Sequence, residues 1–342
     1  MISHSSGRIL DRLLRFAAVL WLVLPVCQSA ATAENDGRWA ILVAGISGEP
    51  AIQADYLKQI RELNAILVDQ YGFQKDRIPV LFDDPSKGPG LVRYQSTREG
   101  LSQACRDIAA RSTAGDLIIV FILGHGSFDG AHYKLNLVGP DPTAEELASM
   151  IYSIPARNFV VVNTTTCSGA SLKALSGTGK VVITATKSGR EGNQTRMSGF
   201  FVEALKDHNS DVDKNGRVSV LEAFNYAVAK VEEYYSKEGS LQTEHPVLDD
   251  NGDGEGHSNP GPDNGDGLIA RTIYLDSDKA LLTSSSPGSE SVALAREAES
   301  LEKQIEALKY SKKDMSESEY EKKLEELLLN LARTNAKLKR YR

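Results

Sequence analysis

The sequence predicts an α/β fold with a mostly parallel six-stranded sheet, helices on both of its faces, and a C-terminal α-helical hairpin. Short apolar runs alternate with amphipathic helical patterns along most of the chain. The run at 117–123 is almost wholly apolar, which is typical of a strand that is buried on both faces. The C-terminal part instead repeats apolar residues at heptad-like spacing, which indicates paired helices.

The expected elements follow one another in strand–helix order, and this order implies a three-layer arrangement. Ser96-x-x-Glu99 and Thr143-x-x-Glu146 are capping boxes that open two of the helices. The expected helices lie at 54–72, 96–110, from 143 onward, at 198–207 and at 219–236. The expected strands lie at 39–45, 78–82, 117–123, 158–163, 180–185 and 270–275.

Residues 1–33 predict a secretory signal peptide. Basic residues precede an apolar run at 16–26, and small residues follow up to Ala33. The run is shorter than the about 20 residues that a membrane span needs. We therefore expect cleavage near Ala33, export to the periplasm or outside the cell, and no membrane span afterwards. An uncleaved anchor is one alternative, and a lipoprotein is another that the bulk of Val26 disfavours.

The remaining chain divides into a main domain at 34–276, a Ser- and Asp-rich linker at 277–291 and a helical hairpin at 292–342. In the hairpin, the first apolar positions recur at 4-3-4-3 spacing, and another capping box at Ser316 opens the second helix. We expect the charged positions to form a solvated face, and self-association or partner binding is the alternative role.

The hydrophobic content, net charge and cysteine count of the chain exclude some classes of function. Hydrophobic residues make up 41% of the chain, which supports a packed core, and the formal net charge is −7. An acidic protein lacks the basic surface that phosphates require, so we expect no nucleic-acid partner. Signal cleavage leaves Cys105 and Cys167, too few for a disulfide scaffold, and both a single bridge and free thiols agree with this count.

Two predicted strands end in reactive residues. The run 117–123 is followed by His125-Gly126, and the run 158–163 leads to Cys167. Because reactive groups of an open α/β sheet collect at the carboxyl ends of its strands, we expect His125 and Cys167 to meet there. The other histidines are weaker candidates, since they lie in the signal peptide, in polar segments or without a strand directly before them.

The pairing of His125 with Cys167 predicts nucleophilic catalysis. A thiol is mostly protonated at neutral pH, and a nearby imidazole takes up its proton. The backbone N–H groups of Gly126 and Cys167 are the expected oxyanion hole. The structural alternative is that Cys167 is a small buried hydrophobic residue and that His125-Gly126 is a turn.

These motifs resemble those of the caspase-like cysteine peptidases, and most closely the legumain and glycosylphosphatidylinositol-transamidase branch. The resemblance is carried by His125-Gly126-Ser127 after one strand and by Cys167-Ser168 after the next. Segments 39–45, 53–55 and 78–84 also echo the opening of that branch, and the similarity covers roughly 38–207.

The resemblance implies a caspase-like three-layer sandwich, a Cys167/His125 dyad and an oxyanion hole at the Gly126 and Cys167 amides, with no cofactor required for the chemistry. The specificity residues of legumains do not carry over. Ala51-Ile52 replace an Arg-His pair, and Thr165-Thr166 replace Glu-Ala before the nucleophile. The S1 specificity therefore stays open.

A second motif, in the loop 211–222, matches the EF-hand calcium loop at every ligand position. Oxygen ligands at this spacing suit Ca²⁺ better than a transition metal. The alternative is a polar loop in which Ser219-x-x-Glu222 only caps the next helix. The candidate calcium ligands are Asp211, Asp213, Asn215, Arg217 through its carbonyl, Ser219 and Glu222.

The acidic loop 245–267 contains the sequence DNGDG twice. It is interpreted either as a second calcium-ordered loop, with Asp249, Asn251 and Asp253, or as a flexible acidic loop. If the strand at 270–275 runs antiparallel, as in caspase-like folds, this loop lies on the catalytic face.

The sequence thus predicts an exported cysteine endopeptidase that cleaves peptide or protein substrates through a thioester acyl-enzyme, with Ca²⁺ as a candidate regulator. Transpeptidation is a variant of the same chemistry. The alternatives are a catalytically inactive caspase-like scaffold and a calcium-binding interaction protein.

Overall fold

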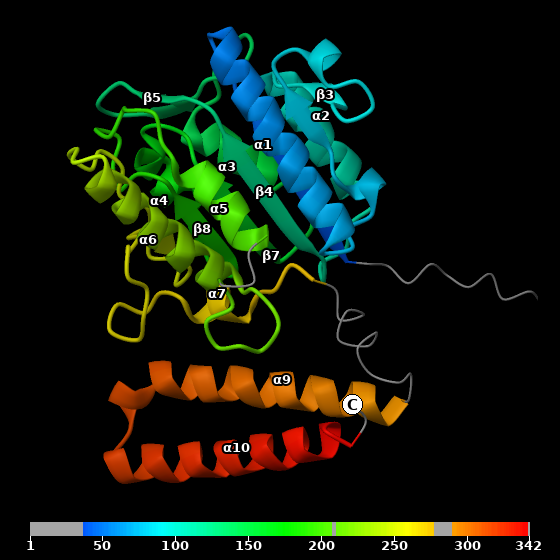
Figure 1. The fold of residues 1–342 in the computed structure, drawn as a ribbon, viewed down its shortest axis with the longest axis vertical. Coiled ribbons are helices and arrows are strands. Elements are labelled where there is room, and N and C mark those ends of the chain that lie inside the picture. Colours follow the sequence, from blue (N-terminus) through cyan, green and yellow to red (C-terminus); the bar gives the residue numbers. More distant parts are fainter. Residues whose placement is uncertain (1–36, 207–209, 277–288, 341–342) are drawn as a thin grey trace, which may run out of the picture. The chain divides into compact units, whose positions relative to one another are not determined.

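The computed structural model describes residues 37–206, 210–276 and 289–340 (Figure 1). The predicted signal peptide and residues 277–288 of the predicted linker lie outside the described residues.

A seven-stranded sheet with the order β3-β2-β1-β4-β7-β8-β9 forms the centre of the main domain (Figure 1). All neighbouring strands are parallel except β8 and β9. The α/β class and the mostly parallel sheet are confirmed, and the predicted number of six strands is wrong. The strands are β1 (Arg38–Ala44), β2 (Val80–Phe82), β3 (Tyr94–Gln95), β4 (Leu117–Leu123), β7 (Asn158–Asn163), β8 (Lys180–Thr184) and β9 (Val247–Asp249). A separate hairpin pairs β5 (Gly126–Phe128) with β6 (Tyr133–Leu135).

Helices cover both faces of the sheet, because successive side chains of a strand point to opposite sides. In β1, Ala40 and Leu42 belong to the core on one face, whereas Trp39 and Ile41 belong to the core on the other. The first face carries α1 (Pro50–Asp69), α5 (Met197–Lys206), α6 (Val220–Lys237) and the short α7 (Leu268–Thr272). The second carries α2 (Arg98–Ala109), α3 (Ala144–Ile151) and α4 (Leu172–Leu175). Single 3₁₀ turns lie at Lys75–Arg77, Pro85–Lys87, Ser168–Ser171 and Lys312–Asp314.

The strand predicted at 270–275 is wrong, since most of this run lies in α7 or just after it. The buried carboxylate of Asp250 accepts the N–H groups of Gly267 and Ala270, at 2.7 and 2.8 Å, and so stabilises the start of this helix. The antiparallel edge strand is instead β9, which lies inside the predicted acidic loop. Because the residue that stabilises the start of α7 is distant in the sequence, residues 268–272 carry no local signal for a helix.

The start of α3 matches the prediction, since Thr143 and Glu146 form the complete capping box. The box predicted at Ser96 and Glu99 is displaced by one residue, because the side chain of Thr97 accepts the N–H that caps α2. Ser96 is buried and donates its own N–H to the carbonyl of Phe82 at 2.8 Å. Ser96 therefore bonds to the end of β2 at the edge of the sheet, and Thr97 caps the helix in its place.

The tail forms two helices that pack along each other, α9 (Ser289–Tyr310) and α10 (Glu317–Leu338). Ser316 accepts the N–H of Glu319 and caps α10. Leu328 and Leu329 of α10 are about half exposed, at 48% and 49%. The buried positions of α9 are those of the 4-3-4-3 spacing, Leu294, Ala298, Leu301, Ile305 and Leu308.

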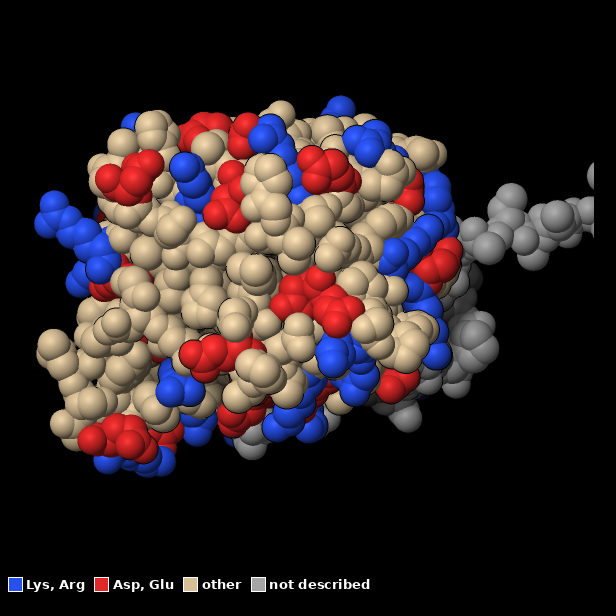
Figure 2. All heavy atoms as spheres, turned by 90° about the horizontal axis from the view of Figure 1, so that it is seen from above, with Lys and Arg blue, Asp and Glu red and all other residues tan. Residues whose placement is uncertain are grey.

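Charged side chains are mixed on the surface that Figure 2 shows, where lysines and arginines alternate with aspartates and glutamates around a broad uncharged area. Within the part of the chain that the structure describes, no helix combines the length and the apolar character that a membrane crossing requires.

Candidate active site

His125 and Cys167 both lie just beyond the carboxyl ends of neighbouring parallel strands. His125 stands between β4 and the β5–β6 hairpin, and Cys167 follows β7 and directly precedes a 3₁₀ turn. The N–H of Thr164 donates to the carbonyl of Ile122 at 2.8 Å, which extends the pairing of β7 with β4 toward Cys167.

Thr166 joins the two chain segments that carry the candidate dyad. Its hydroxyl accepts the N–H of Gly126 at 3.0 Å and donates to the Gly126 carbonyl at 2.7 Å. Because Gly126 follows His125 and Thr166 precedes Cys167, these two bonds hold the predicted dyad residues at one edge of the sheet. No hydrogen bond within the described chain joins the thiol to the imidazole, whose Nε2 lies 3.4 Å from the hydroxyl of Tyr56.

Both dyad residues are neutral in this conformation. Burial lowers the pKa of His125, and burial raises the pKa of Cys167 despite an opposing hydrogen bond from Thr166. Only 7% of Cys167 is exposed. These two directions favour a thiol and a neutral imidazole for the candidate pair at neutral pH.

The two predicted oxyanion donors are engaged inside the protein. The Cys167 N–H donates to the Glu191 carbonyl at 2.9 Å, and the Gly126 N–H donates to Thr166. Cys167 also has a left-handed backbone, with φ of 58°. A substrate oxyanion at these amides requires both hydrogen bonds to open, so this conformation is a closed form of the predicted site.

The segment 187–196, called here the occluding loop, covers Cys167. A Cβ atom added to Gly192 would lie 3.7 Å from the Cys167 sulfur, so the loop backbone passes close to the thiol. The Glu191 carboxylate fixes the loop by accepting from His245 Nδ1 at 2.6 Å and from the His245 N–H at 3.2 Å. The same carboxylate accepts the N–H of Lys187 at 3.0 Å.

The neighbouring Glu244 holds the other end of the occluding loop. Its carboxylate accepts the N–H groups of Arg196 at 2.7 Å and of Met197 at 3.2 Å, and burial raises its pKa to about 7. Residues 244–245 therefore contact the loop at two points, one on each side of the segment over Cys167.

A buried polar network lies beneath the nucleophile position. Thr165 donates its hydroxyl to Asn163 Oδ1 at 2.8 Å and lies 2.7 Å from the Tyr133 hydroxyl. Asn163 donates in turn to Ser171, at 3.0 Å, on the far side of Cys167. The two threonines before the cysteine thus have structural partners, which explains polar β-branched residues at these buried positions.

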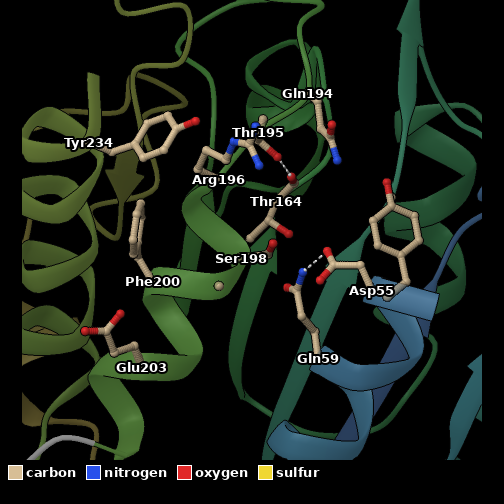
Figure 3. A pocket seen from close by; sticks show the side chains of 13 residues that line it. Asp55, Gln59, Thr164, Gln194, Thr195, Arg196, Ser198, Phe200, Glu203 and Tyr234 are labelled. Atoms are coloured by element: carbon tan, nitrogen blue, oxygen red, sulfur yellow. Dashed lines mark hydrogen bonds between the residues drawn. The ribbon is translucent and has the colours of Figure 1, made fainter. Parts of the chain in front are cut away.

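A cavity of about 440 Å³ opens between α1 and α5 (Figure 3), and its lining includes Tyr56 and Gly124 but neither His125 nor Cys167. Asp55 and Gln59 of α1 form one wall, where the Gln59 amide donates to Asp55 at 2.8 Å. Arg196 and Phe200 form the opposite wall. A carboxylate and a guanidinium therefore line opposite sides of one cavity, and Tyr56, which contacts His125, also lines it.

The loop 211–222 gathers three of its predicted calcium ligands. Carboxylate oxygens of Asp211, Asp213 and Glu222 lie within 4.8 Å of one another. Glu222 also forms a complete capping box with Ser219, so the predicted cap of the next helix is confirmed. Burial, followed by the charge of Glu222, raises the pKa of Asp213. Hard oxygen donors crowded in this way fit a Ca²⁺ ion, which would neutralise their repulsion.

The other predicted ligands of this loop have partners of their own. The Asn215 side-chain oxygen accepts the Arg217 N–H at 2.8 Å, while its amide donates to Asp213 at 3.1 Å. The Arg217 guanidinium forms a bidentate pair with Asp276 and leaves the carbonyl as the only ligand that this residue offers.

The segment 249–266 repeats the hydrogen bonds of this loop. Asp249 accepts the N–H of the glycine five residues later at 2.8 Å, as Asp211 does at the same distance. Asp266 accepts the N–H groups of the second and third residues at 3.1 and 3.3 Å, where Glu222 accepts the equivalent groups at 2.9 and 3.3 Å. Asp266, from the second DNGDG, thus occupies the place of the closing glutamate.

Three residues of the site have no motif in the sequence: Tyr56, Glu191 and His245. Tyr56 directly follows the segment 53–55, which echoes the opening of the legumain branch, and this neighbourhood is the one signal that the sequence offers for it. Glu191 and His245 meet at 2.6 Å from segments far apart in the chain, which only the fold brings together. The two remaining cysteines are both free, so no disulfide forms between them.

Comparison with known proteins identifies no family for this chain. No family model and no curated protein matches the sequence. Among solved structures, the chain is similar to protein GSU0716 from Geobacter sulfurreducens, a structural genomics target, with 13% identity and a TM-score of 0.40. The match covers 66% of this chain and 95% of that chain.

Proposed function

We propose that the chain is an exported cysteine endopeptidase of the caspase-like type, with Cys167 as nucleophile and His125 as general acid–base. The observation that carries this proposal is the hydrogen bond from the Thr166 hydroxyl to the Gly126 carbonyl at 2.7 Å, which joins the two segments that carry the candidate residues and does not use the Gly126 N–H that the oxyanion needs. The basic, apolar and small-residue pattern of 1–33 supports export.

The reaction follows from the neutral resting pair. His125 takes the thiol proton as the Cys167 sulfur attacks a peptide carbonyl carbon, and then gives that proton to the leaving amine. The amide bond breaks, and a thioester remains on Cys167. Water attacks the thioester and releases the acid, or an amine attacks in its place and forms a new peptide bond. Opening of the occluding loop precedes these steps, because it frees the Cys167 N–H for the oxyanion.

A peptide probe with an electrophilic ketone tests the nucleophile. We expect the probe to label wild-type protein at Cys167 and to leave Cys167→Ala unlabelled, with a much lower rate in His125→Ala. Cys105 serves as the internal control, because burial raises the pKa of its thiol to about 12. Equal labelling of wild type and Cys167→Ala would show the scaffold without catalysis to be the correct alternative.

Calcium binding is a second candidate function, supported by the three carboxylates of 211–222 that lie within 4.8 Å of one another. Asp211, Asp213 and Glu222 would hold the ion, with the Arg217 carbonyl as a further ligand. Calorimetric titration of wild type and Asp211→Ala with Ca²⁺ tests this function, and equal heats would exclude the loop.

A further inference from the structure

Tyr56 is the side chain that contacts the candidate acid–base residue. Its hydroxyl oxygen lies 3.4 Å from His125 Nε2, and the two rings are 6.2 Å apart at 57°. Tyr56 is 5% exposed and belongs to the buried core of α1, so the helix fixes its position.

We propose that Tyr56 is a positioning residue that acts through His125, an inference that rests on the peptidase function proposed above. His125 Nε2–H donates to the Tyr56 hydroxyl oxygen, and Nδ1 is left unprotonated to accept the thiol proton of Cys167. With the hydroxyl oxygen as the acceptor, Tyr56 holds the ring and keeps the proton on Nε2 during proton transfer.

The surroundings of His125 favour this arrangement. No carboxylate of the described chain hydrogen-bonds to the imidazole, and burial is the cause that lowers the pKa of His125. The charged group that acts on the pair is Asp55 on α1, which follows Gln53 and Ala54 and directly precedes Tyr56. Burial and the Asp55 charge raise the pKa of Tyr56 to about 12, so the phenol keeps its proton throughout the neutral range.

A neutral phenol differs in its effect from the carboxylate of a catalytic triad. It orients the ring without adding a full charge that would stabilise the imidazolium. The bond from Nε2–H still strengthens when the ring is charged, because charge-assisted hydrogen bonds are stronger than neutral ones. Removing the hydroxyl should therefore lower the pKa of His125 further and reduce the rate of the chemical step.

The test compares Tyr56→Phe with Tyr71→Phe in the mature chain. Tyr71 is a matched control, since its buried hydroxyl donates to the Leu205 carbonyl at 2.8 Å, away from the dyad. The first measurement is the ¹⁵N NMR titration of the His125 ring, with the signal assigned from His125→Gln. The second is the pH profile of peptide cleavage.

We expect Tyr56→Phe to lose the Nε2–H tautomer preference, to lower the His125 pKa, and to reduce kcat about 3- to 10-fold with KM unchanged. Tyr71→Phe should leave all three unchanged. The inference is overturned if the His125 tautomer and pKa match those of wild type, or if the pKa rises. Because the titration needs no turnover, it tests the role of Tyr56 even if the protein cleaves no peptide.

Discussion

Removing the Glu191 carboxylate should open the occluding loop and expose Cys167. In Glu191→Ala the backbone carbonyl that accepts from Cys167 is still present, but the side-chain bonds to His245 and Lys187 are lost. The substitution therefore weakens the anchor of the loop without touching either candidate catalytic side chain.

The size of the effect follows from the bonds that are lost. The carboxylate accepts hydrogen bonds at 2.6, 3.2 and 3.0 Å. Each bond contributes about 1 kcal/mol net, and the partly exposed His245 reduces the sum, so we take about 2 kcal/mol in favour of opening. This corresponds to an open population about 30-fold larger than in wild type.

The assay is the alkylation rate of Cys167 by iodoacetamide, located by peptide mass spectrometry. We expect Glu191→Ala to react about 30-fold faster than wild type, because the reaction proceeds from the open form. Glu62→Ala is the matched control, since it removes an exposed bond from Lys206 at 3.0 Å away from the loop. Equal rates in the two variants would refute the occluding role of Glu191.

Three further predictions concern the same domain. Thr166→Val leaves the Gly126 N–H without its acceptor, so urea titration should show a loss of about 2 kcal/mol in the free energy of unfolding, which Thr166→Ser restores. Burial raises the pKa of Cys167, so its alkylation rate should climb with pH through a midpoint above that of an ordinary thiol. Ca²⁺ should raise the Tm of wild type but not of Asp211→Ala, because that substitution removes one of the three clustered carboxylates.

Each of these predictions has an opposing outcome. Wild-type stability in Thr166→Val would mean that the hydroxyl bridge contributes nothing to the fold. An alkylation midpoint at or below the ordinary thiol value would show an ion pair of Cys167 and His125 at rest. An equal rise of Tm in Asp211→Ala would place the calcium effect outside 211–222.

Much of the sheet is predictable because its strands carry their own signal. The run that forms β4 is wholly apolar, the run that forms β7 is apolar between two asparagines, and the bounds of both strands in the structure are those of the prediction. β9 escaped prediction because its three residues lie among turn residues, and only pairing with β8 makes them a strand. A strand can be predicted from its own residues when they are continuously apolar. A short strand such as β9 depends on pairing with its neighbour and cannot be predicted in this way.

The candidate dyad was predictable for a similar reason, since strand ends fix the place of His125 and Cys167 in any open parallel sheet. The state of the site was not predictable. The hydrogen bond from Cys167 to Glu191 depends on a loop whose anchor, His245, is contributed by a segment beyond α6. Short motifs thus locate the candidate residues, whereas contacts between distant segments determine how exposed those residues are.

The left-handed backbone of Cys167 implies a conflict between stability and chemistry at this position. A side chain at φ of 58° is strained relative to glycine by about 1 kcal/mol. Cys167→Gly should therefore be about 1 kcal/mol more stable than Cys167→Ala, although both lack the thiol. The nucleophilic role proposed for Cys167 would explain why a cysteine occupies a position where glycine is less strained.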